Sequence, residues 1–168
     1  MKTLFLSFCL LIALIPSAYS QHNETKPVKV FILAGQSNMD GCGIGEDLPK
    51  KYQSSPTNVM AWDNKKKIWV DLVETTFSIR REKQFGPEMA FAHALSAAYP
   101  NFTIGIVKTS GGGTKLYNHW LPDSVMYRRC FQNFENATHQ LIETKQTYEL
   151  SGMLWMQGES DSETLEMA

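Results

Sequence analysis

Three short apolar runs recur along the chain, and each is followed at once by glycine or polar residues. Residues 28–34 (VKVFILA), 103–108 (TIGIVK) and 150–156 (LSGMLWM) are rich in β-branched, aromatic and aliphatic side chains. Runs of this length and composition are typical of strands buried on both faces of a parallel sheet. The pattern therefore predicts three buried parallel strands.

Segments with helical periodicity separate these runs. Gly86 and Pro87 begin a helix that we expect to end near Tyr99, because proline costs nothing in a first helical turn. After Asp123 or Ser124, either of which suits a helix cap, apolar residues recur at steps of three and four. They predict one buried helical face, formed by Met126, Cys130, Phe134, Ala137 and Leu141.

This alternation of strands and helices predicts a three-layer α/β/α sandwich around a parallel sheet. Residues 58–62 and 67–72 predict a hairpin with Lys65, Lys66 and Lys67 in its solvated turn. Three core strands and a hairpin are few for such a sheet, and the third strand would be an exposed apolar edge. We therefore expect residues 21–168 to be the N-terminal part of a domain truncated at its C-terminus.

The ends of the three runs supply the candidate chemistry, because ligands bind at the carboxyl ends of parallel strands. Ser37 follows the first run, and a serine there suits a nucleophile with backbone donors nearby, although a turn or cap serine is commoner. Gly112 lies in the glycine loop after the second run, and Gln157 follows the third. These residues predict acyl transfer, with an oxyanion hole built from the N–H groups of Ser37 and Gly112 and the amide of Gln157.

Composition and the motifs that are missing argue against several classes of partner and cofactor. Lys and Arg number 16 against 17 Asp and Glu, which argues against nucleic acid or an anionic membrane as the main partner. No run of 18 apolar residues follows the first segment, so we expect no membrane span. No HExxH motif or paired CxxC motif is present, so we expect no zinc. The acidic residues Glu159, Asp161 and Glu163 are better explained by a helix dipole than by a cation site.

The first twenty residues have the pattern of a secretory signal peptide. Lys2 precedes an apolar stretch, Pro16 ends it, and small residues at positions 18 and 20 suit cleavage before Gln21. We therefore expect secretion. Candidate glycosylation sites are Asn23, Asn101 and Asn136.

Removal of the first twenty residues leaves Cys42 and Cys130 in the mature chain. One disulfide between them is open, but Cys130 also suits a buried free thiol in its apolar helical face.

Four ordered segments resemble a known family. They are AGQSNMDG (residues 34–41), FGPEMAFAHAL (85–95), IVKTSGGGTKL (106–116) and WMQGESD (155–161). Together they look like the sialate O-acetylesterase domain, also called carbohydrate esterase family 6-like, of the SGNH (GDSL-type) hydrolases. The resemblance implies a flavodoxin-like fold and a serine esterase that removes acetyl groups from sugars, with no metal or organic cofactor.

Residue by residue, the resemblance makes Ser37 the nucleophile and Gln157 the glutamine of the oxyanion hole. It makes Gly112 the glycine of that hole, although Gly111 or Gly113 would take this place after a shift of one residue. Asn38 and Glu159 match motif positions that we expect to hold the loops together.

One part of the family pattern is missing. The family has its catalytic histidine in a D-x-x-H-like block near the C-terminus, whereas His22, His93, His119 and His139 lie in other contexts. We therefore expect the general base to lie beyond residue 168.

The alternative function is a secreted, inactive carbohydrate-binding protein. Its sugar-stacking surfaces would come from four tryptophans, although core packing suits Trp155 better: Trp62, Trp69, Trp120 and Trp155. Sialic acid and xylan both stay open as the acetylated sugar.

Overall fold

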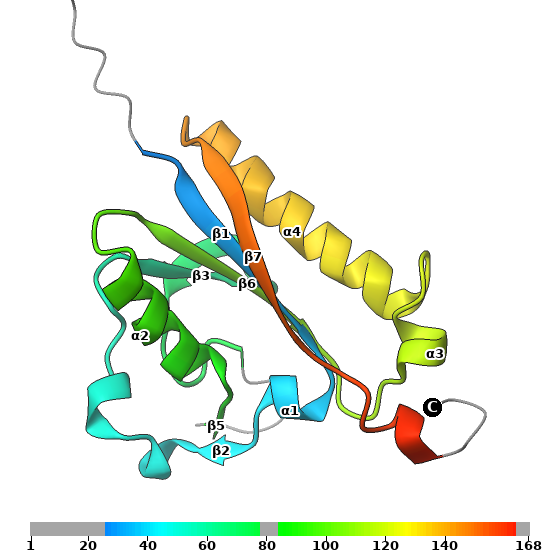
Figure 1. Ribbon diagram of the computed structural model, residues 1–168. Helices are drawn as coiled ribbons and strands as arrows, with labels where there is room; N and C mark the ends of the chain where they lie inside the picture. The colour runs from blue at the N-terminus through cyan, green and yellow to red at the C-terminus, as the bar shows by residue number, and fades with distance from the viewer. Residues whose placement is uncertain (1–25, 78–83, 164–168) are drawn as a thin grey trace, which may run out of the picture.

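The computed structural model describes residues 26–77 and 84–163 and shows a mostly parallel sheet with helices on both faces (Figure 1). The strands of this sheet run in the order β4-β3-β6-β1-β7, and β4 alone is antiparallel to its neighbour. Their bounds are β1 (Val28–Gly35), β3 (Val59–Asp63), β4 (Ile68–Asp71), β6 (Ile104–Ser110) and β7 (Tyr148–Met156). A small second sheet pairs β2 (Gly43–Ile44) with β5 (Gln84–Phe85).

The helices follow the predicted pattern. The two long ones, α2 (Glu88–Ala98) and α4 (Val125–Glu143), confirm the helices expected from proline placement and periodicity. The shorter helices are α1 (Ser37–Asp40) and α3 (Leu116–His119), with the 3-10 turns η1 (Gly45–Asp47), η2 (Lys50–Tyr52) and η3 (Asp161–Glu163).

The two faces of the sheet carry separate cores. On one face, Phe31 and Leu33 of β1 pack in a cluster with Met89 of α2. On the other face, Val30 packs in a cluster with Leu141 of α4. Neighbouring residues of a strand point to opposite faces, so β1 is buried on both sides. The three-layer α/β fold expected from the sequence is therefore confirmed.

The hairpin formed by β3 and β4 extends the main sheet, since β3 also pairs in parallel with β6. On the other side of β6, Gly35 of β1 lies opposite both Ser110 of β6 and Met156 of β7. The three predicted strands thus end level with one another. This register brings the three loops that follow them to the same edge.

Strand β7 lies at the edge of the described sheet, so the prediction that it is buried on both faces is wrong. The expectation that the third strand forms an exposed apolar edge is confirmed. Leu150 is 55% exposed, Met153 53% and Trp155 40%. The expectation that Trp155 packs in the core is also wrong, since Trp62 and Trp120 are the buried tryptophans. An apolar run specifies a strand, but its neighbours in the sheet decide whether both faces are covered.

Several expectations concern covalent features. Cys42 is exposed and Cys130 half-buried, and both are free thiols, so they do not form a disulfide. Asn101 is exposed in the turn after α2, and Asn136 is half-buried in α4.

Residues 1–20 and Asn23 lie outside the described residues. Within the described ranges, no helix is long and apolar enough to cross a membrane.

Candidate active site

Ser37 lies at the point where the central strand ends. Strand β1 stops at Gly35, where a Cβ atom would lie 1.9 Å from the carbonyl oxygen of Met156. Only glycine allows this approach, and it lets the N–H of Gln36 donate to the same carbonyl at 2.9 Å. Ser37 follows as the half-buried first residue of α1. Its hydroxyl makes no hydrogen bond with any other described residue.

The glycine loop follows β6 directly beside this turn. The N–H of Gly111 donates to the carbonyl of Gly35 at 3.1 Å, so Gly111 ties the two loops together and has no free donor. Gly113 has a φ of +72°, a conformation that favours glycine, and a Cβ there would meet nothing within 4 Å. Within the described part of the chain, the N–H groups of Gly112 and Gly113 have no hydrogen-bond acceptor. Both are thus available to a ligand.

The third loop is bound to the second by Gln157. Its amide nitrogen donates to the carbonyl of Thr114 at 2.8 Å and to Oδ2 of Asp161 at 3.3 Å. The two N–H groups are therefore occupied, while Oε1 is buried without a partner among the described residues. The role of Gln157 as an oxyanion donor stays a prediction, and it requires the amide to release one of these partners.

Asp161 contributes to the site in a way that sequence reasoning missed. It is 6% exposed, and its carboxylate accepts the backbone N–H groups of Leu116 at 2.8 Å and Tyr117 at 3.0 Å. Burial raises the pKa of Asp161, but these two hydrogen bonds, that from Gln157 and the charge of Lys115 together hold it below its ordinary value. The residue thus acts as an anionic cap on α3, rather than only as an acid in its own turn. In the sequence, the feature that could have indicated this role of Asp161 is its position at the end of the QGESD segment.

Two further contacts join the first loop to the third. The side chain of Asn38 donates to the carboxylate of Glu159. Gln36 and Ser160 exchange two hydrogen bonds of 3.2 Å, one from the side chain of Gln36 and one from the backbone of Ser160. The loop that contains the serine is therefore held to the loop that contains Gln157.

The histidines of the described ranges have other partners. Nδ1 of His119 accepts the N–H of Lys115 at 3.0 Å, within its own helical turn. Nε2 of His93 lies 3.0 Å from the carbonyl of Ser54, and His139 pairs with Glu143 at 3.4 Å. None of these three histidines forms a hydrogen bond with Ser37, so the described residues supply a serine and backbone donors but no histidine paired with that serine.

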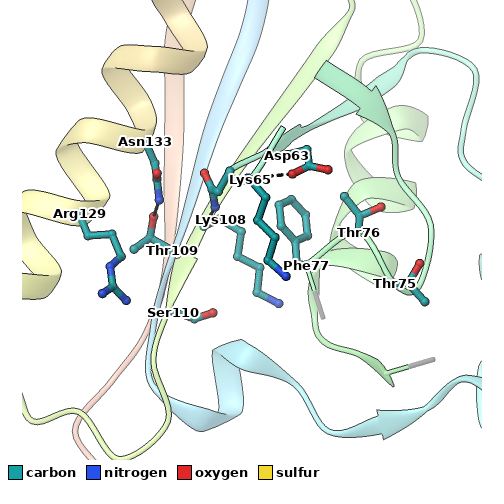
Figure 2. A pocket seen from close by; sticks show the side chains of 11 residues that line it. Asp63, Lys65, Thr75, Thr76, Phe77, Lys108, Thr109, Ser110, Arg129 and Asn133 are labelled. Atoms are coloured by element: carbon teal, nitrogen blue, oxygen red, sulfur yellow. Dashed lines mark hydrogen bonds between the residues drawn. The ribbon is translucent and has the colours of Figure 1, made fainter. Parts of the chain in front are cut away.

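A cavity of about 530 Å³ opens beside the carboxyl ends of β3 and β6 (Figure 2). Its lining comes from β6, from the turn after β3, from the segment after β4 and from α4. Lys65 and Arg129 are exposed cations at its wall, and Ser110 connects it to the glycine loop. Sequence reasoning assigned Lys65 only to a solvated turn. The described ranges contain no group of three or more side chains suited to a metal ion.

The sequence of this chain also matches a known protein family. Residues 27–168 match the family described as carbohydrate esterase, sialic acid-specific acetylesterase. The chain belongs to this family. The match includes the turn formed by residues 36–41, called here the serine turn, together with the glycine loop and the QGESD segment.

Relatives in this carbohydrate esterase family are distant. The chain is 28% identical over 159 residues to a probable carbohydrate esterase of Arabidopsis thaliana, At4g34215, with 80% of this chain and 55% of that protein covered. The structure of At4g34215 matches with a TM-score of 0.70 and 24% identity, over 84% of this chain and 62% of that chain. A crystal structure of NanS matches with a TM-score of 0.63 and 19% identity, and the match covers 83% of this chain and 57% of that chain. The chain thus spans little more than half the length of these relatives.

Proposed function

We propose that this chain contributes the nucleophile and oxyanion loops of a secreted serine esterase that removes O-acetyl groups from carbohydrates. One observation carries the proposal. Among the described residues, the hydroxyl of Ser37 and the N–H groups of Gly112 and Gly113 have no partner, and they lie on loops tied to one another at the same sheet edge. A nucleophile and donors for developing negative charge are the two requirements of acyl transfer. The family match supports the same reaction class.

In this proposal, Oγ of Ser37 attacks the carbonyl carbon of the acetyl group. The sugar oxygen leaves with a proton, and acetyl-Ser37 remains. Water then attacks this ester and passes one proton through the base to Oγ of Ser37, and acetic acid leaves and ionises to acetate. The base that carries these protons comes from outside the described residues. Gly112 and Gly113 stabilise the oxyanion, and Gln157 joins them if its amide turns away from Thr114.

The cavity beside Ser110 favours an acidic sugar as the substrate. Lys65 and Arg129 stand at its wall beside the single carboxylate of Asp63, so the exposed cations outnumber the anion and would attract a sugar carboxylate. A neutral sugar such as xylose would use neither of them. We therefore propose acetylated sialic acid rather than acetylated xylan, in agreement with the description of the family. Secretion is proposed on the pattern of residues 1–20 alone.

The test is acetate release from an acetylated sialoside and from p-nitrophenyl acetate, measured on the protein that includes the region expected to supply the base. Ser37→Ala should abolish it, whereas Ser151→Ala, a serine in the first half of β7, should leave it unchanged. Release that survives Ser37→Ala would contradict the proposal.

A binding titration with the same sialoside addresses the carbohydrate-binding alternative. Two observations favour it, namely the absence of a described histidine at Ser37 and the occupied amide of Gln157. Saturable binding of the sialoside without acetate release, by a folded protein that includes the region expected to supply the base, would overturn the esterase proposal in favour of a binding protein.

A further inference from the structure

A complete ion pair is buried beneath the serine turn. Nζ of Lys108, in β6, lies 2.6 Å from Oε2 of Glu88, the first residue of α2, and the two side chains are only 1% and 2% exposed. Removing two charges from water is expensive, and a buried pair by itself is weak evidence for stability. The role of this pair therefore depends on a further partner.

That partner is the backbone of α1. Nζ of Lys108 also donates to the carbonyl oxygen of Asp40 at 2.9 Å, and Asp40 is the last residue of the helix that Ser37 begins. The other oxygen of Glu88 accepts the N–H of Gly86 at 2.8 Å. The pair therefore links β6, the start of α2 and the end of the serine turn.

The packing at this point leaves no space for a methyl group. A Cβ atom on Gly86 would lie 2.6 Å from Oε2 of Glu88, 2.9 Å from the carbonyl oxygen of Asp40 and 3.0 Å from Nζ of Lys108. The three polar atoms thus converge on the backbone of Gly86.

Helix α1 needs such support. It has four residues, and its turn is closed by two hydrogen bonds, from the N–H of Asp40 to Gln36 at 2.8 Å and from that of Gly41 to Ser37 at 3.0 Å. A single turn is unstable alone, because several dihedral angles must be ordered for each bond. A cation at its last carbonyl compensates for unpaired acceptors and opposes the negative end of the helix dipole.

We propose that Glu88 and Lys108 form a positioning device for Ser37. Glu88 orients the ammonium group of Lys108, Lys108 holds the Asp40 carbonyl, and the closed turn fixes the direction of Ser37. Both are positioning residues, since neither touches the reacting atoms. The catalytic consequence rests on the proposed function, whereas the effect on the turn does not.

The test uses the double variant Glu88→Gln/Lys108→Met, which removes both charges and leaves no lone buried ion. Amide hydrogen exchange is measured by NMR on the chain. At Asp40 and Gly41 exchange should accelerate at least tenfold, while the amide of Leu141 in α4 keeps its wild-type rate. The matched control is Lys29→Met/Glu149→Gln, which removes a more exposed ion pair between β1 and β7 and should change neither.

Gly86→Ala provides a second route, because it retains both charges and inserts a methyl group where they converge. It should also accelerate exchange at Asp40 and Gly41. Wild-type protection of both amides in a folded double variant and in Gly86→Ala would overturn the proposal. Equal acceleration at Leu141 would overturn it too, because the pair would then act on the whole fold.

An activity measurement extends the test. The double variant should lower kcat for Ser37-dependent acetate release from p-nitrophenyl acetate about tenfold with KM unchanged, since this substrate has no sugar to enter the cavity that Lys108 lines. An unchanged kcat alongside faster exchange would overturn the catalytic part. If the wild type released no acetate, the proposed function would fail, and the exchange rates would still decide whether the pair holds the turn.

Discussion

Asp161→Asn is the sharpest probe of how the loops are held together. The carboxylate of Asp161 accepts the N–H of Tyr117 through Oδ1, and those of Leu116 and Gln157 through Oδ2. Asparagine retains one oxygen and replaces the other with an NH₂ group, which cannot accept. Its better orientation keeps the two bonds at the Oδ2 position, so the bond from Tyr117 is lost.

The size of the effect follows from this count. A hydrogen bond to a charged group contributes about 1.5–3 kcal/mol, and Tyr117 is exposed, so water can partly replace its lost partner. We expect Asp161→Asn to lower the free energy of unfolding by about 2 kcal/mol at pH 7. The substitution should also weaken the attachment of the glycine loop, because the amide of Gln157 donates to both Asp161 and Thr114.

The sign of the pH dependence is set by the lowered pKa. Burial raises the pKa of Asp161, but the hydrogen bonds from Leu116 and Tyr117 outweigh it, so the pKa in the folded protein lies below the ordinary value of an aspartate. Stability from this group is fully present above the unfolded pKa, about 3.9, and is lost as pH falls through the folded value. The gap between wild type and Asp161→Asn should be constant from pH 7 to 5 and should close below about pH 4.

Urea denaturation at several pH values measures this gap. Asp47→Asn, at an exposed aspartate in η1, is the control and should change stability little at any pH. A gap that persists unchanged at pH 3 would refute the reasoning, because the carboxylate charge would then contribute nothing. So would a gap below 0.5 kcal/mol at pH 7, since that is the usual range for surface substitutions.

Three further predictions concern the strand ends and the core. Gly35→Ala should destabilise the chain by about 3 kcal/mol in urea, because its Cβ would overlap the Met156 carbonyl at 1.9 Å; wild-type stability would contradict this contact. Leu141→Ala, at a residue with 0% exposure, should cost about 2–5 kcal/mol in the same assay, and a cost below 1 kcal/mol would place Leu141 outside the core. Cys42 should react with a thiol reagent faster than Cys130, since burial raises the pKa of Cys130 against an opposing hydrogen bond with Thr109; equal rates would contradict its half-buried position.

The candidate site depends on side chains that join loops rather than on any one loop. Asn38, Gln36 and Gln157 each contact a residue more than forty positions away. Such contacts fix the mutual positions of a nucleophile and its donors, which is what preorganised electrostatic catalysis requires. Loss of one contact should therefore disturb two loops together.

The sequence by itself determined the local elements and the edge where they meet. The apolar runs at residues 28–34 and 103–108 predicted β1 and β6, and the periodic apolar face predicted α4. These features depend on near neighbours in the chain, through side-chain alternation and helical period. Parallel strands then place their carboxyl ends together, so Ser37, Gly112 and Gln157 were assigned to one edge without any contact being known.

Only the tertiary structure decided what each polar side chain touches. Nothing near Lys108 in the sequence indicates that it is buried beside Glu88, and nothing near Gln157 indicates that Thr114 and Asp161 occupy its amide. The composition of β7 likewise predicts a buried strand, and its edge position was expected only from the number of strands. The physical reason is the same in each case: a hydrogen bond, an ion pair or a strand neighbour is formed by segments far apart in the chain, and the register of the whole sheet sets their distance.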